Sequence, residues 1–359
     1  MLPYVKIDFK NGSLGGVEPM DDGGTLAIIP GLNLEENIDC LTYEDFVDKA
    51  DTESTKVAAF FTEAGGKCRL IVSSAEPTEA NIKALLSDYA GDIRHVVIDG
   101  ATSAQLNTLQ AVGEWAAAQL YAPVMFFVSV AGVTPKTLGL NRVAVVDTVT
   151  NAQENGVALL WYVAGRAAQL PVQRSVARAK DGALTATEWY YTEGSGANAT
   201  VKLVNNLYAE PKHNSGYITV RTFQGKAGYY ISDDLMAAEP SDDYHLIPRR
   251  RTIDKAYRIA YSTLVNAIGD EIPVSNSGKI SVTYCKDLSN AVEQAIYNTM
   301  TIYGNLGTDP ANASDKGVQC YIDPDQNVVA TSRVEVALNV KPYGYAKYIE
   351  VKLGFNTAI

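Results

Sequence analysis

The sequence predicts a mixed α/β protein with an α/β core layer, a β-rich middle segment and a C-terminal domain of two helices and β-strands. Short apolar runs alternate with amphipathic runs over residues 56–165, which is typical of a sheet with helices on both faces. Two long amphipathic runs follow residue 248, and their period predicts helices. Both ends of the chain alternate apolar and polar residues, which predicts extended strand arms.

With 359 residues, the chain is long enough for two or three compact units. We expect five segments. They are an N-terminal strand arm and hinge (1–20), an α/β domain (21–170), a β-rich segment (171–247), a helical and β domain (248–341) and a C-terminal strand arm (342–359).

The N-terminal arm is predicted from alternation followed by glycine. Val5, Ile7 and Phe9 share one face of a strand, and polar residues occupy the other face. The predicted hinge glycines are Gly12, Gly15 and Gly16.

The α/β domain is expected to begin with a strand at 25–29 and a helix from 42, where Thr42 and Asp45 resemble a capping box. The further strands are expected at 68–73, 95–99, 124–130 and 142–146, and the further helices at 77–86, 102–121 and 156–170. In the β-rich segment, strands are expected at 187–191 and 200–208, and a hairpin at 217–231.

The C-terminal domain is expected to contain a helix at 252–268 that Gly269 ends, a strand at 280–285 and a helix from an Asp287 cap to Gly304. The stripe of the second helix would run to Met300 and Tyr303. A strand at 333–341 and a last strand at 346–355 complete the chain.

The last strand carries Ile349, Val351 and Leu353 on one face. Pro342 and Gly344 are its predicted hinge.

Composition excludes several classes of protein. A net charge of −11 argues against direct nucleic-acid binding and against an anionic membrane surface as partner. The longest apolar runs, such as 122–130, are shorter than a membrane span, so no membrane insertion is expected. The N-terminus shows no signal-peptide pattern, which predicts a cytoplasmic site of synthesis and assembly.

No catalytic fingerprint is present, and no cofactor or metal is expected. The histidines His95, His213 and His245 have no zinc-site spacing, and no nucleophile elbow or Walker A motif occurs. Four widely separated cysteines are expected to be buried thiols. The carboxylates Asp233, Asp234, Asp242 and Asp243 leave open a metal site in one loop.

A basic cluster is the remaining candidate site. Its five members are Arg249, Arg250, Arg251, Lys255 and Arg258. Two interpretations stay open: intramolecular pairing with the carboxylates of the acidic loop, or a docking patch for an acidic partner surface.

Four segments together give a resemblance to a known family. They are 163–182, 228–234, 244–259 with its arginine-rich helix entry, and 341–353 with its proline before an alternating strand. In these segments the chain resembles the contractile tail sheath proteins of bacteriophages, especially the compact sheath-like proteins of Mu-like prophages.

The resemblance implies a structural subunit and not an enzyme. Sheath subunits polymerise around an inner tail tube, exchange terminal strands with their neighbours, and contract to drive the tube through a cell envelope. The implied partners are other copies of the chain, the tube protein, the baseplate and the tail terminator, in a virion tail assembled in the bacterial cytoplasm. The basic cluster would contact the tube.

Three alternatives remain. The chain could be an α/β metal-dependent enzyme that uses Asp233 and Asp243, a tube or capsid component, or the sheath of a tailocin or a secretion-like device.

Overall fold

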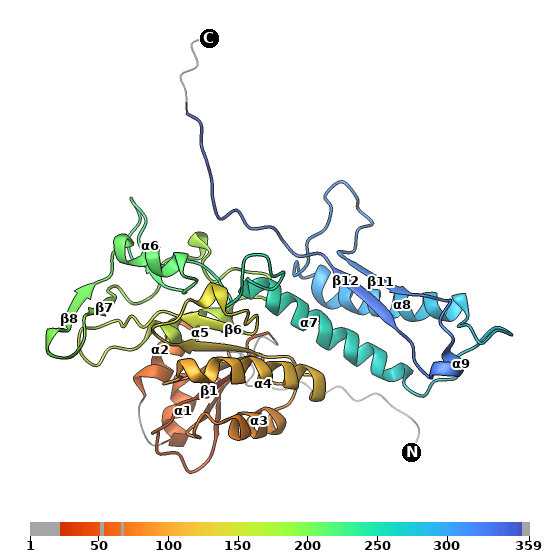
Figure 1. Cartoon of the computed structure of the whole chain (residues 1–359), viewed down its shortest axis with the longest axis horizontal. Coiled ribbons are helices and arrows are strands. Elements are labelled where there is room, and N and C mark those ends of the chain that lie inside the picture. Colours follow the sequence, from red (N-terminus) through yellow and green to blue (C-terminus); the bar gives the residue numbers. More distant parts are fainter. Residues whose placement is uncertain (1–21, 51–53, 66–67, 354–359) are drawn as a thin grey trace, which may run out of the picture. The chain divides into compact units, whose positions relative to one another are not determined.

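The computed structural model describes residues 22–50, 54–65 and 68–353. It has the mixed α/β fold that the sequence predicts (Figure 1). The chain divides into a first unit that ends at Arg258 and a second unit that begins at Ile259. The boundary falls inside helix α7 (Ile247–Leu264).

A six-stranded sheet forms the centre of the first unit. Its strands, in spatial order, are β2 (Ile38–Cys40), β3 (Leu70–Ser73), β1 (Thr25–Ile28), β4 (His95–Ile98), β5 (Met125–Ser129) and β6 (Val143–Val146). All neighbours pair in parallel except β2, which is antiparallel to β3. The five parallel strands confirm the predicted ones, whereas β2 was not anticipated.

Helices cover both faces of this sheet because successive strand residues point to opposite sides. Leu26 and Ile28 of β1 pack with the apolar side chains of α3 (Glu79–Asp88) and α4 (Leu106–Gln119). Ala27 and Ile29 pack instead with α1 (Tyr43–Ala50), α2 (Thr55–Ala64) and α5 (Leu159–Gln169). The result is a three-layer core (Figure 1).

The capping box at the start of α1 is confirmed. The Asp45 backbone N–H donates to Thr42 Oγ1 at 3.2 Å, and the Thr42 N–H donates to Asp45 Oδ2 at 3.0 Å. Two backbone donors at the helix N-terminus are thereby satisfied by side chains.

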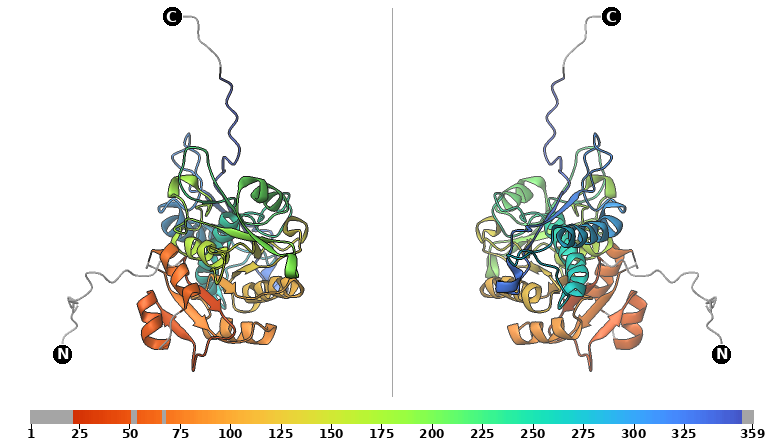
Figure 2. Two further views of the ribbon diagram at one scale, coloured as in Figure 1. Left: turned by 90° about the vertical axis from the view of Figure 1, so that its left-hand side faces the viewer. Right: turned by 90° about the vertical axis from the view of Figure 1, so that its right-hand side faces the viewer.

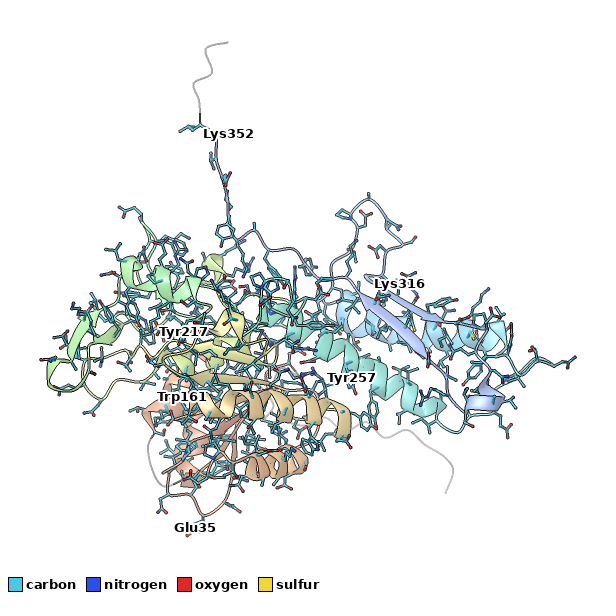
Figure 3. All side chains as sticks on the ribbon, in the orientation of Figure 1. Glu35, Trp161, Tyr217, Tyr257, Lys316 and Lys352 are labelled. Atoms are coloured by element: carbon cyan, nitrogen blue, oxygen red, sulfur yellow. The ribbon has the colours of Figure 1, made fainter. Side chains whose placement is uncertain are left out.

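Helices α2 and α5 pack closely at Gly165. A Cβ atom at this position would lie 2.3 Å from the carbonyl oxygen of Phe60. Trp161, one turn earlier on α5 and labelled in Figure 3, is fully buried. The absence of a side chain at Gly165 therefore lets the backbones of α2 and α5 come close together next to the buried Trp161.

The middle segment differs from its prediction in one place. Strands β7 (Tyr190–Glu193) and β8 (Thr200–Leu203) form an antiparallel ribbon, and the hairpin of β9 (Val220–Arg221) and β10 (Tyr230–Ile231) is confirmed. The expectation of a strand through residue 208 was wrong, because helix α6 (Asn206–Asn214) begins there. The Asn205 side chain accepts from the Tyr208 N–H at 3.0 Å, which starts the helix.

The second unit contains the last turns of α7, then α8 (Val282–Ile296), β11 (Val318–Ile322), α9 (Val328–Thr331) and β12 (Val336–Val340). The strand expected at 280–285 was wrong: α8 begins at Val282 with Ser281 as its N-cap residue, so Asp287 lies inside the helix. Helix α7 begins at Ile247 and not at 252, with Pro248 in its first turn, where proline is tolerated.

A hydrophobic stripe holds α8 and the π-helical turn Tyr297–Thr301 in the second unit. Val292, Ile296 and Met300 are buried as expected. Tyr303 is 74 % exposed, so its assignment to the stripe was wrong.

Candidate functional site

The β11–β12 hairpin is a two-stranded sheet, and no third strand of the described residues pairs with it. The Lys341 N–H donates to the Gly317 carbonyl at 2.8 Å, and Val318 lies opposite Val340 in an antiparallel register. Because hydrogen-bonded pairs alternate in such a ladder, the backbone groups of Val336, Leu338 and Val340 point away from β11.

The two edges of this hairpin differ. On the β11 side, the Cys320 N–H donates to Glu293 Oε1 of α8 at 2.9 Å, so a side chain already uses a donor of that edge. On the β12 side, no strand from the described residues pairs with the outer edge. The edge of β12 is therefore the open one.

The segment after β12 carries the alternating apolar residues of the predicted C-terminal arm. Residues 341–353 form neither helix nor strand, so the last strand expected at 346–355 does not form over its described part in the single chain. Ile349, Val351 and Leu353 are 79, 77 and 95 % exposed. Figure 2 shows the extended backbone of this segment, and Figure 3 shows side chains along it as far as Lys352. We call residues 346–353 the tail.

The other arm residues have different outcomes. Pro342 and Gly344 lie between β12 and the tail, and a Cβ atom at Gly344 would meet open space. Their role as a hinge stays a prediction. Val5, Ile7, Phe9, Gly12, Gly15 and Gly16 lie outside the described residues.

The basic cluster is in large part buried inside the first unit. Arg250 and Arg251 are 8 and 4 % exposed. Arg250 Nη2 lies 2.6 Å from Asp254 Oδ1, and Arg142 Nη1 lies 3.2 Å from Asp254 Oδ2. The carboxylate of Asp254 thus joins α7 to the start of β6.

Asp22 is the second carboxylate at these cations. Lys255 Nζ lies 2.8 Å and Arg258 Nη2 3.9 Å from its carboxylate. Arg251 Nη2 donates to the backbone carbonyls of Asp22 at 3.2 Å and Leu170 at 2.7 Å. We name Asp22, Arg251, Lys255 and Arg258 the Asp22 cluster.

The interpretation of intramolecular pairing therefore has acceptors that the sequence analysis did not name. Asp22 stands 233 residues from Lys255, and no spacing or motif in the sequence connects them. A contact of the basic cluster with an inner tube stays a prediction.

The acidic loop is held by internal contacts. Asp233 and Asp234 are 8 and 0 % exposed, and Asp233 Oδ1 accepts from the Asp234 N–H at 2.8 Å. Asp242 accepts from Asn141 Nδ2 at 3.1 Å and from the Tyr244 N–H at 2.7 Å. Over the described ranges, no three His, Cys, Asp or Glu residues are grouped as metal ligands.

Family comparison identifies the chain. A model described as the DUF2586 N-terminal domain matches residues 2–235, and one described as the DUF2586 C-terminal domain matches residues 243–359. The chain belongs to the DUF2586 family. No curated protein matches it in sequence.

Solved structures show which fold this DUF2586 protein has. A chain of the contracted sheath complex of PVC, an extracellular contractile injection system, is 13 % identical, with a TM-score of 0.67 over 99 % of this chain and 98 % of that one. A chain of the anti-feeding prophage baseplate is 15 % identical, with a TM-score of 0.64 over 99 % of both chains. The sheath tail protein of Desulfitobacterium hafniense is 10 % identical, with a TM-score of 0.54 over 95 % of this chain and 100 % of that one. The DUF2586 protein thus has the fold of contractile sheath proteins.

Two kinds of titratable group in this DUF2586 protein are shielded from solvent. His95 packs against Phe127 with ring centroids 5.8 Å apart, and burial, helped by the Arg251 charge, lowers the pKa of His95 well below 6.5. All four cysteines are buried free thiols. Burial raises the pKa of Cys40 to about 12 and that of Cys68 to about 11, which suppresses thiolate chemistry.

In the described parts of the DUF2586 chain, no helix is both long enough and apolar enough to span a bilayer.

Proposed function

We propose that this DUF2586 protein is the subunit of a contractile sheath that polymerises by exchange of terminal β-strands. The proposal rests on two complementary features of the same chain. The tail exposes an alternating apolar face, while β12 has an outer edge that no described strand covers.

The physical argument concerns unpaired strand edges. An open edge presents backbone donors and acceptors that can pair with another chain. Main-chain hydrogen bonds to an added strand supply affinity, and alternate side chains supply specificity. If the tail of one copy paired with the β12 edge of the next copy, the backbone groups of both segments would be hydrogen-bonded. The same contact could then repeat from copy to copy along a polymer.

The fold supports the same function. The likeness to chains of contractile sheath structures extends over nearly the whole length of both chains compared. Sheath-type function requires no active site, which fits an acidic loop held by internal contacts.

The remaining parts of the proposal concern partners. We place an inner tail tube inside the polymer and a baseplate and tail terminator at its ends, with contraction driving the tube through a cell envelope. The basic cluster is the proposed tube contact. Because Arg250 and Arg251 are buried, such a contact requires a rearrangement that frees them from Asp254 and from the Asp22 and Leu170 carbonyls.

The particle type is a finer proposal. We propose a contractile tail-like particle assembled in the bacterial cytoplasm, and a virion tail as its specific form. Isolation of the particle decides between forms: a capsid with DNA on the same tube identifies a virion, and a tube without a capsid identifies a tailocin or secretion-like device.

Electron microscopy of the purified full-length chain tests the central proposal. We expect hollow striated cylinders from the intact protein, and none after deletion of residues 1–15 or of residues 342–359. Unfolding of the chain lacking residues 342–359 should match that of the intact monomer, because the tail is exposed and contributes little burial. Single particles of the intact chain under all salt and protein concentrations would refute the sheath function.

A further inference from the structure

A small polar cavity of ≈ 10 Å³ lies in the first unit, beside the starts of β4 and β5. A space of this size holds one water molecule or one monatomic ion and excludes larger groups such as phosphate. Its described lining residues are Asp22, Arg94, His95, Pro123, Met125, Val172, Arg251, Asp254 and Arg258. Three arginines and a histidine around so small a space make it a candidate ligand site, which we call the arginine cavity.

His95 presents its imidazole to the arginine cavity. The residue is 1 % exposed, and neither Nδ1 nor Nε2 has a hydrogen-bond partner among the described residues. Buried polar groups are almost always hydrogen-bonded, so these two nitrogens indicate that a small polar species belongs beside the ring. A neutral imidazole offers such a species one N–H donor.

The charges around His95 favour an anion over a cation. Arg94, Arg251 and Arg258 line the cavity, and after burial itself their charges are what lowers the pKa of His95. A positive potential that keeps an imidazole neutral also attracts a negative ion.

The two carboxylates in the wall of the cavity are each shared between two cations. Asp254 lies 3.2 Å from Arg142 Nη1 and 2.6 Å from Arg250 Nη2. Asp22 is shared in the same way within the Asp22 cluster. Charges in poorly solvated places are costly unless opposite charges balance them. A further negative charge beside these groups would therefore be stabilising.

We propose that the arginine cavity binds a single halide ion, which is chloride in ordinary salt solutions. The ion accepts the N–H of His95 and charge-assisted hydrogen bonds from the surrounding guanidinium groups. Because Arg94 and Arg258 are only half-buried, the ion can enter by displacement of their side chains. Its role is to join the start of β4 to α7 within the first unit, which does not depend on the proposed sheath function.

Urea denaturation of the full-length chain in two salts of equal ionic strength tests for the ion. Sodium gluconate replaces sodium chloride in one series, because gluconate has too many atoms for a cavity of this volume. Tryptophan fluorescence follows the first unit alone, since Trp115, Trp161 and Trp189 all precede Arg258. An ion that binds only the folded chain stabilises it by mass action. We therefore expect a higher urea midpoint in chloride, which rises with the logarithm of the chloride concentration.

Arg94→Gln separates binding at the site from general effects of the two salts. The difference in midpoint between chloride and gluconate should be lost in this variant. Arg178→Gln is the matched control and should retain the difference, because Arg178 is absent from the described lining and pairs with Asp181 at 2.8 Å on the surface. An equal difference in all three chains, or a midpoint of the unsubstituted chain that is no higher in chloride, would overturn the proposal and favour a water molecule in the cavity.

A fixed carboxylate gives a second test, in which the site is filled and not removed. Val172 lines the cavity and is 2 % exposed, whereas Val176 is 1 % exposed in the hydrophobic core. Val172→Asp supplies the negative charge covalently, so its urea midpoint should no longer respond to chloride. Val176→Asp should lower the midpoint much further, because it buries a charge among apolar side chains. Equal losses in the two variants, or a chloride response that persists in Val172→Asp, would contradict an anion site.

Discussion

Asp22, the first described residue, makes several polar contacts with the basic cluster. Its carboxylate faces Lys255 and Arg258, and its backbone carbonyl accepts from Arg251. The side chains of Asp22 and Lys255 are 6 and 13 % exposed, so removal of the carboxylate would leave cations in a poorly solvated place. Such a loss is costly even where the intact pair contributes little net stability.

We therefore expect Asp22→Asn to lower the free energy of unfolding by about 3 kcal/mol, measured by urea denaturation. Asp325→Asn is the control, because Asp325 pairs with Lys279 at 2.8 Å with side chains 74 and 47 % exposed. An exposed pair of this kind contributes at most about 1 kcal/mol. Equal effects of the two substitutions would contradict the structural role of the Asp22 cluster.

His95 predicts how stability depends on pH. Its pKa is lowered in the folded chain by burial and by the charges of Arg251, Arg94 and Arg258, so the native imidazole stays neutral below pH 6.5. The unfolded chain takes up a proton there and the native chain does not. The free energy of unfolding should therefore fall as pH drops below 6.5, by about 1.4 kcal/mol per pH unit from this group.

Denaturation between pH 7.5 and 5.5 measures this slope. His95→Gln should reduce the slope over that window relative to the unsubstituted chain. The comparison concerns slopes and not absolute stabilities, because His95→Gln also changes packing against Phe127. An unaltered slope in His95→Gln would contradict the assignment.

Between elements, the contact of α2 with α5 depends on Gly165. Gly165→Ala would place a methyl group 2.3 Å from the Phe60 carbonyl oxygen, so the two helices must separate. Overpacking of this kind costs about 1–3 kcal/mol, outweighing the better helix propensity of alanine. Ala118→Ser, at an exposed position of α4, adds one atom on the helix surface and is the control. Equal losses of thermal stability in the two variants would contradict the close packing at Gly165.

Sequence patterns predicted many elements whose burial is one-sided or complete, although the largely buried helix α2 was not among them. The parallel strands and α4 with its stripe through Leu109 and Val112 were found because apolar periodicity reports burial directly. The starts of α6, α7 and α8 were not, because local capping and tertiary packing decide them. At α8, for example, the β-branched run after Ile280 favours a strand, yet Val282 already belongs to the helix.

The candidate site was predictable in part for the same reason. The alternation of Ile349, Val351 and Leu353 indicates a donor strand without any structure. The open edge of β12 did not emerge from the sequence, because alternation in 333–341 shows a strand but not which of its edges stays unpaired. Likewise, Asp22 became a partner of the basic cluster only through tertiary folding, whereas Asp254 lies one helical turn after Arg250.

For the whole molecule, charge sets the conditions of self-association. Each subunit carries a net charge of −11, and repulsion between such subunits weakens as salt shortens the screening length from roughly 30 Å at 0.01 M to 8 Å at 0.15 M. We expect light scattering at fixed protein concentration to show more polymer as sodium chloride rises over this range. A decrease would mean that attractive ion pairs between subunits outweigh their net repulsion, and a chain with the tail removed should scatter weakly throughout.

The two margins of the six-stranded sheet in the first unit bear on solubility during synthesis. One margin is the three-residue strand β2, whose Asp39 binds Arg69 at 2.6 Å. At the other margin, Val146 of β6 forms a parallel bridge with Ile218. A short charged border and a covered border both discourage sheet-to-sheet adhesion. Newly made chains are therefore protected from associating through their largest sheet. In the proposed polymer, strand addition would then be left to the small hairpin of the second unit, where access to a single tail could regulate it.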